Sequence, residues 1–182
     1  MSAARIAPGG RREVGLFTWV LSHVGGRVAR TGPVNLFLTL GRHRKLFRRW
    51  LWFAGALMPG GILPRREAEL VILRVAHLRS SRYELEHHER LGRRAGLDDG
   101  DLARVAEGSA ATGWRPRESA LLAAVETLHR QGDLDDATWS ELRRHLDERE
   151  TIELCLLTGQ YEMLATAIAA LRIQPDARTG PG

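Results

Sequence analysis

The residues best suited to chemistry lie in residues 80–97, which read SSRYELEHHERLGRRAGL. Within this stretch Ser81, Glu84 and His88 are spaced i, i+3, i+7, so on a helix their side chains lie along one stripe. An imidazole has a pKa of about 6.5, and a neighbouring carboxylate fixes its tautomer and exchanges protons with it. The spacing therefore predicts an acid–base site that includes Glu84 and His88.

A second carboxylate lies one predicted helix upstream. Glu69 shares a helical stripe with Ser80, where that segment ends. If this segment packs against the next helix as a tight pair, Glu69 reaches His88. The predicted proton-transfer cluster comprises Glu69, Glu84 and His88, and its predicted lining residues are Tyr83 and His87.

The same spacing has a purely structural interpretation. Ser81 and Glu84 match a capping box, in which the serine side chain accepts from the third helical amide and the glutamate reaches back to the cap. In that case both histidines lie on a solvated face, and Glu69 pairs with a nearby arginine. Spacing alone leaves the two interpretations open. A metal site made from His87 and His88 is not expected, because adjacent helical residues diverge by about 100°.

The number of cysteines limits the thiol chemistry available to this chain. Cys155 is the only cysteine, so an intrachain disulfide, a Cys–Cys redox pair and a cysteine-based zinc site are excluded. Its apolar surroundings in the sequence predict a small buried hydrophobic residue. We expect neither a metal nor a cofactor.

The elements that position these residues are all predicted to be helices. Apolar residues at helical spacing indicate a helix over 65–79, and a second helix begins near Ser81 and ends at Gly96. Further helical segments are predicted over 13–30, 35–58, 98–108, 117–130, 136–147 and 150–172. No segment alternates as a strand does. We predict an all-α, single-domain bundle of about seven or eight helices over 13–173, between flexible tails at 1–12 and 174–182.

Composition narrows the class of protein. The chain has 182 residues and a formal net charge of +5, but its basic residues are scattered arginines without a nucleic-acid recognition motif, so no nucleic-acid partner is expected. The longest uncharged run, 51–63, is interrupted by Pro59 and two glycines and is shorter than the roughly 20 residues of a membrane span. A cytoplasmic protein is expected.

Residues 66–105, REAELVILRVAHLRSSRYELEHHERLGRRAGLDDGDLARV, resemble the core motif of the carboxymuconolactone decarboxylase family, which is similar in fold to alkyl hydroperoxidase D. The shared pattern is Arg-Glu-x-x-Glu-Leu, an apolar run, Tyr-Glu, a histidine pair and Ala-Gly-Leu. The likeness extends over about residues 34–172. It implies an all-α bundle that assembles into trimers or hexamers, with sites near subunit contacts. The apolar, Trp-rich segment 50–58 independently predicts such a contact.

The resemblance also implies residue roles. In the peroxidase branch, a Cys-x-x-Cys-x-x-x-His segment works with an upstream glutamate as a proton relay. That glutamate falls on Glu69 and the histidine on His88, whereas the two cysteines fall on Ser81 and Glu84. Neither of these residues performs thiol chemistry, so disulfide-cycling peroxidase activity is disfavoured, and the chain is more similar to the decarboxylase branch.

The decarboxylase branch implies loss of carbon dioxide from a carboxylated lactone of aromatic catabolism while a proton moves on the ring. We therefore expect a cofactor-free, lyase-type enzyme acting on a small anionic lactone or keto acid, with Arg66 or Arg74 as the cation that binds the anion. The alternatives are an antioxidant or peroxidase-like protein of the same superfamily and a non-catalytic helical oligomer or binding protein.

Overall fold

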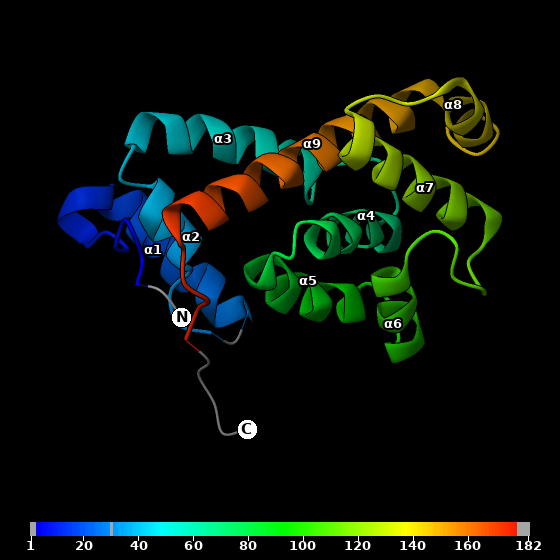
Figure 1. The fold of residues 1–182 in the computed structure, drawn as a ribbon. Helices are drawn as coiled ribbons and strands as arrows, with labels where there is room; N and C mark the ends of the chain where they lie inside the picture. Colours follow the sequence, from blue (N-terminus) through cyan, green and yellow to red (C-terminus); the bar gives the residue numbers. More distant parts are fainter. Residues whose placement is uncertain (1–2, 30, 178–182) are drawn as a thin grey trace. The chain divides into compact units, whose positions relative to one another are not determined.

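The computed structural model describes residues 3–29 and 31–177. Within these residues the regular elements are nine helices, without a β-strand, so the predicted all-α class is confirmed. The helices are α1 (Arg11–Ala29), α2 (Asn35–Leu40), α3 (Arg44–Leu57), α4 (Arg65–Leu78), α5 (Arg82–Arg94), α6 (Asp99–Glu107), α7 (Pro116–Gln131), α8 (Asp136–Arg143) and α9 (Glu148–Leu171) (Figure 1).

The single helix predicted over 35–58 is wrong, because the chain turns between α2 and α3. Gly41 lies at this turn, where a Cβ atom would come within 2.5 Å of Cγ2 of Thr18 and 2.6 Å of the carbonyl oxygen of Phe37. Only glycine fits so close to α1. The apolar periodicity runs across the break, so it does not reveal the turn.

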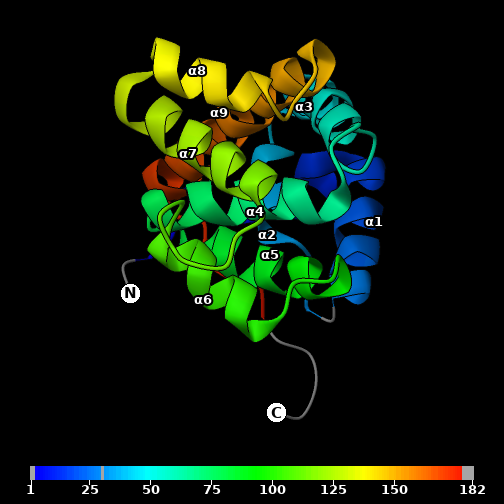
Figure 2. The same cartoon turned by 90° about the vertical axis from the view of Figure 1, so that its right-hand side faces the viewer.

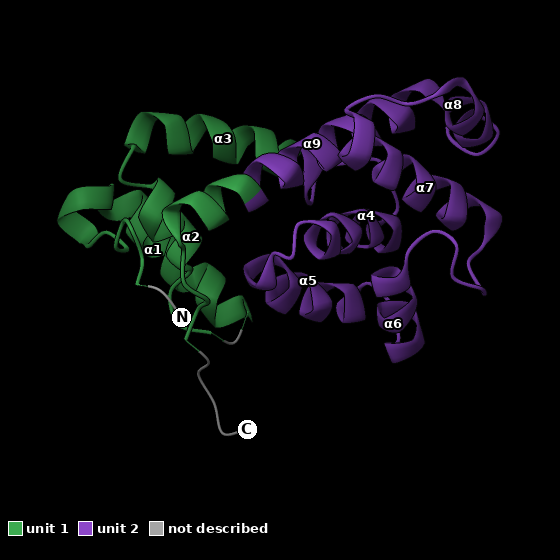
Figure 3. Ribbon diagram, viewed as in Figure 1, with its two compact units in different colours: residues 1–56, 166–182 green, residues 57–165 purple. Residues whose placement is uncertain are grey.

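The chain divides into two compact units, shown in Figure 3. Unit 1 comprises Met1–Ala56 and Thr166–Gly182, and unit 2 comprises Leu57–Ala165. Every residue of the predicted proton-transfer cluster lies in unit 2.

In unit 1, α1 packs against α2 through a stripe of buried residues four positions apart, which includes Val14 and Thr18. Segments outside the helices also form hydrogen bonds with helical residues of this unit. The amide of Arg5 donates to the carbonyl of Leu171, and the amide of Asn35 donates to Asp176 Oδ1. These contacts involve the described parts of the two predicted tails, whereas residues 1–2 and 178–182 lie outside the described residues.

Unit 2 is organised around α4. Its sequence RREAELVILRVAHL is apolar on most of its faces after the first turn, which is typical of a helix covered on all sides. Accordingly Val71, Ile72, Leu73 and Val75 have no exposed surface. Helix α4 contacts α5, α6 and α7, and it lies between α5 and α7 in both views (Figures 1 and 2).

Helix α9 is long and apolar enough to cross a membrane by length and composition. It nevertheless contributes Leu154 and Leu157, both fully buried, to the hydrophobic core of unit 2. This burial is typical of the core helix of a soluble protein.

A tight turn joins α4 to α5. Ser80 adopts the left-handed conformation with a φ of 50°, and the amide of Ser81 donates to the carbonyl of Ala76. The chain thereby reverses within a few residues, and the two helices that the sequence predicts over 65–79 and 81–95 pack against each other.

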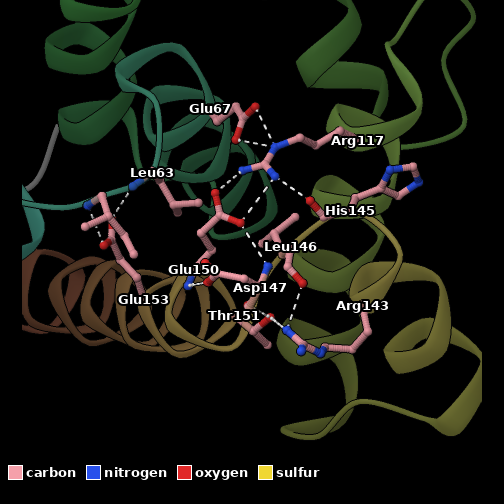
Figure 4. Close-up of polar contacts among 11 residues, drawn as sticks. Leu63, Glu67, Arg117, Arg143, His145, Leu146, Asp147, Glu150, Thr151 and Glu153 are labelled. Atoms are coloured by element: carbon pink, nitrogen blue, oxygen red, sulfur yellow. Dashed lines mark hydrogen bonds and ion pairs between the residues drawn. The ribbon is translucent and has the colours of Figure 1, made fainter.

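Charged side chains fix the start of α4. Arg117 of α7 donates through Nε to both carboxylate oxygens of Glu67, through Nη2 to Glu150 and through Nη1 to the carbonyl of His145 (Figure 4). One guanidinium thus joins the first turns of α4, α7 and α9. The segment before α4 is held as well, because Glu153 of α9 accepts from the amide of Leu63 at 3.0 Å.

Candidate active site

Glu69 and His88 form a buried pair between α4 and α5. Nδ1 of His88 lies 2.7 Å from Oε2 of Glu69, whose side chain is completely buried. An ionised carboxylate only accepts hydrogen bonds, so the bonded nitrogen carries the proton and Nε2 is the nitrogen available for proton exchange. The pair that the sequence predicts is therefore present.

Glu84 lies on the other side of the same imidazole. Its Oε2 is 3.5 Å from Nε2 of His88, one turn further along α5. Burial raises the pKa of the Glu84 carboxyl, whereas the neighbouring His88 and His87 act in the opposite direction. His88 is thus placed between two buried carboxylates from different helices, an arrangement that suits proton relay through an imidazole.

The capping-box interpretation is wrong. Ser81 precedes the first residue of α5, but its side chain makes no capping hydrogen bond. With a φ of −83° and a ψ of 86°, Ser81 lies outside the extended conformation of a usual N-cap. Among the described residues, neither Oγ of Ser81 nor Oε1 of Glu84 has a hydrogen-bond partner, although both atoms are buried.

The rings of Tyr83 and His87 stack on each other, with centroids 5.0 Å apart. Tyr83 is buried and His87 is half-buried. Tyr83 directly precedes Glu84 and His87 directly precedes His88, so the two rings lie on the neighbouring stripe of α5. His87 is close enough to influence the pKa of Glu84. Their predicted role in substrate binding stays a prediction.

Arg66 and Arg74 do not join the cluster. Arg66 donates to Asp101 at 2.7 Å and to Glu118 at 2.8 Å, and these partners raise its pKa further above its ordinary value. Arg74 lies 2.8 Å from Glu126 and donates to two carbonyl oxygens at the end of α6. Both side chains tie α4 to α6 and α7, so their charges are already balanced by carboxylates.

The arginine at the cluster is Arg65. Its Nη2 lies 2.9 Å from Oε1 of Glu69, one turn along α4, and its side chain is 42% exposed. Arg65 therefore balances the charge of the buried Glu69 and also reaches solvent. Arg65 was not among the predicted site residues, although the i, i+4 spacing of an arginine and a glutamate is a recognisable signal for a pair.

Tyr161 of α9 completes the cluster. Its ring meets the ring of His88 edge-on, with centroids 5.1 Å apart and an interplanar angle of 88°. Burial, followed by the charges of Glu84 and Glu69, raises the pKa of Tyr161 well above its usual value, so the phenol stays neutral. Tyr161 is distant from α5 in sequence, and no local spacing identifies it as a neighbour of His88.

The described residues indicate neither a metal site nor a reactive thiol. In the described ranges, no group of three or more histidine, cysteine, aspartate or glutamate side chains is arranged to hold a metal ion. Cys155 is half-buried on α9, and burial raises the pKa of its thiol, which lowers the fraction of reactive thiolate.

Residues 44–127 match the model of the Carboxymuconolactone decarboxylase family. No match was found among curated proteins. Three solved structures share the fold, each at 17% identity. The first is an uncharacterised peroxidase-related protein from Ralstonia eutropha JMP134, named as an alkylhydroperoxidase AhpD core (TM-score 0.84, covering 100% of both chains). The second is an uncharacterised peroxidase-related protein from Silicibacter sp. TM1040 (TM-score 0.79, covering 90% of this chain and 87% of that chain). The third is the debrominase Bmp8 (TM-score 0.79, covering 96% of this chain and 93% of that chain).

Proposed function

We propose that this chain, whose residues 44–127 match the carboxymuconolactone decarboxylase family model and whose fold is AhpD-like, is a cofactor-free acid–base enzyme. Its proposed substrate is a small carboxylated lactone or keto acid. The observation that carries the proposal is the position of His88 between Glu69 and Glu84 in the interior of unit 2.

The proposed chemistry is lyase-type decarboxylation. The bond to the substrate carboxylate breaks, carbon dioxide leaves, and the electron pair moves into the adjacent carbonyl system. A proton delivered from Nε2 of His88 then completes the product. Glu69 holds the opposite nitrogen and stabilises the imidazolium form, while Glu84 returns a proton to Nε2.

An anionic substrate requires a cation at the site. We assign this role to Arg65 instead of Arg66 or Arg74, because the latter two side chains are held by carboxylates of α6 and α7. The partial exposure of Arg65 supports this assignment, since a substrate carboxylate arriving from solvent meets its guanidinium first. Neutral Tyr161 lies beside His88.

Two of the similar structures are named as peroxidase-related proteins and a third as a debrominase. These names make an antioxidant or dehalogenating activity the alternative. The residues favour it less, because Ser81 and Glu84 occupy the positions of the paired thiols and Cys155 is half-buried elsewhere on α9.

We also propose that the protein is a homo-oligomer, a trimer or hexamer. Unit 1 exposes large apolar side chains on α1 and α3, an arrangement typical of subunit contacts. The most exposed are Leu16, Phe17, Val28, Leu46 and Trp52, the last with 82% of its surface accessible.

The function is tested with a spectrophotometric screen of carboxylated lactones and keto acids. His88→Gln should lower turnover of an accepted substrate by about 10²–10⁴-fold, the usual contribution of a general acid–base group. The matched control is His129→Gln, because His129 also pairs with a glutamate, 2.6 Å from Glu162, but lies outside the cluster. Equal turnover by wild type and His88→Gln refutes the proposed relay, and no turnover of any compound favours a non-catalytic binding protein.

A further inference from the structure

Two buried polar atoms at the start of α5 are left without a partner by the fold. Ser81 is 7% exposed and Glu84 is 4% exposed, yet Oγ of the former and Oε1 of the latter make no hydrogen bond to any described residue. Buried hydroxyl and carboxyl groups are normally satisfied, because burying one unpaired costs free energy. Two such atoms one turn apart therefore indicate a place where another molecule supplies the partner.

The neighbouring contacts define which part of Glu84 is available. Its Oε2 faces Nε2 of His88 at 3.5 Å, so the unpartnered Oε1 is the other oxygen of the same carboxyl group. A ligand bonded to Oε1 thus lies next to the imidazole that carries the proton. The hydroxyl of Ser81 adds a group that both donates and accepts.

The charges around this place disfavour an anion. The ionisable groups of the cluster come from three helices: Arg65 and Glu69 from α4, Glu84, His87 and His88 from α5, and Tyr161 from α9. The cluster contains two carboxyl groups, those of Glu69 and Glu84, and one guanidinium, which is already paired with Glu69. A carboxylate placed beside Glu84 is repelled, whereas an uncharged oxygen is not.

We infer that Ser81 and Glu84 bind an uncharged oxygen of the substrate at the start of α5, with any anionic end of the substrate turned toward Arg65. A substrate hydroxyl donates to Oε1 of Glu84 and accepts from Ser81, whereas a substrate carbonyl accepts from the hydroxyl of Ser81. This assignment rests on the proposed function, because it places that oxygen beside the proton carrier His88. The assignment gives Ser81 a role in substrate binding. By the family resemblance, a thiol of the peroxidase branch falls at this position.

The inference is tested by binding of three probes that share one ring: cyclohexanol, cyclohexanone and cyclohexanecarboxylate. Ligand-observed NMR measures their dissociation constants with wild type, Ser81→Ala and Thr39→Val. The last is a matched control, because Thr39 of α2 is also a buried hydroxyl without a hydrogen-bond partner in the described chain. Thermal unfolding is recorded for each variant.

We expect the carboxylate to bind through Arg65, and the alcohol and the ketone to bind at the start of α5. Ser81→Ala should weaken binding of the alcohol and the ketone about 5- to 10-fold, as expected for loss of one hydrogen bond, and Thr39→Val should not change it. Neither variant should lower the melting temperature, since neither hydroxyl is bonded to a described residue. The inference is overturned if Ser81→Ala weakens binding of the carboxylate as much as that of the uncharged probes, if no uncharged probe binds at millimolar concentration, or if Ser81→Ala lowers the melting temperature without weakening binding.

The binding experiment is independent of turnover. If Ser81→Ala weakens probe binding while no compound in the substrate screen reacts, the binding assignment stands and the proposed enzymatic function fails. If His88→Gln abolishes turnover while Ser81→Ala leaves both probe binding and KM unchanged, the enzymatic function stands and the binding assignment fails.

Discussion

The carboxylate of Glu69 and the imidazole of His88 lie 2.7 Å apart although they are 19 residues apart in sequence and belong to different helices. The contact exists because the turn at Ser80 reverses the chain and brings the two helices side by side. The pair therefore joins α4 to α5 and at the same time sets the tautomer of the imidazole.

Replacing Glu69 by glutamine should lower turnover by about 10²–10⁴-fold, because a neutral amide no longer stabilises the imidazolium form of His88. Steady-state kinetics on an accepted substrate measure this effect. Glu162→Gln is the matched control, since Glu162 also pairs with a histidine but lies outside the cluster. A similar loss in both variants contradicts a specific role for Glu69.

Substitution by glutamine should change a different property at each of the adjacent arginines Arg65 and Arg66: KM at the first and stability at the second. Arg65→Gln should raise KM for an anionic substrate, because its exposed guanidinium is the cation at the cluster. Arg66→Gln should instead lower the free energy of unfolding by about 3 kcal/mol, because it removes the cation that the buried Asp101 and Glu118 share. Kinetics and urea unfolding of the two variants check this contrast, and a KM effect confined to Arg66→Gln contradicts it.

Asp101 should make the fold sensitive to acid. Its hydrogen bond with Arg66, aided by the amide of Asp98 and by Arg104, lowers the pKa of its carboxyl to about 2. A lowered pKa in the folded state stabilises the protein above the ordinary value near 4, and this contribution is lost as the pH falls from about 4 to about 2. We expect a loss of no more than about 2 kcal/mol in urea unfolding across that range. Asp101→Asn should abolish this part of the pH dependence, whereas Asp99→Asn, at an exposed position, should not.

Glu84 should have the opposite pH dependence. Burial raises the pKa of its carboxyl, so the folded state favours the protonated form. Its contribution to stability is therefore present below the ordinary pKa of a glutamate and is lost as the pH rises through the raised value. Turnover should decline over the same interval if Glu84 returns a proton to His88. A pH–rate profile of Glu84→Gln that keeps this alkaline decline contradicts the assignment.

The exposed side chain of Trp52 should contribute to assembly. Trp52→Ser should reduce the oligomer to smaller species in light scattering at micromolar concentration, because it removes the most exposed large apolar side chain of α3. Trp139→Ser is the control, since Trp139 is only 46% exposed, lies on α8 and has Arg143 over its ring. A wild-type protein that is monomeric under these conditions refutes the proposed assembly.

Sequence periodicity predicted the parts of the site that depend on single helices. It placed Glu84 and His88 on one stripe of α5, and the apolar pattern of α4 identified the helix that carries Glu69. Tyr161 was not predictable in this way, because its proximity to His88 depends on how α9 packs against α5. Contacts between distant helices follow from side-chain packing, on which local spacing carries no information.

Sequence spacing was also ambiguous where the same pattern of residues fits two different local structures. Ser81 and Glu84 match a capping box, but the backbone of Ser81 adopts a conformation that directs neither side chain to the cap. Arg66 and Arg74 were candidates for anion binding because charge alone does not identify a partner. The buried carboxylates Asp101 and Glu118 form ion pairs with the first of these arginines.

The left-handed conformation of Ser80 has a consequence for how this site tolerates insertions. One residue added to the turn would rotate α5 by about 100° relative to α4 and would carry His88 away from Glu69. Most substitutions in the turn keep the register, and glycine suits a φ of 50° better than serine does. Among natural or designed variants, the length of this turn is therefore a stricter requirement for the chemistry than its composition.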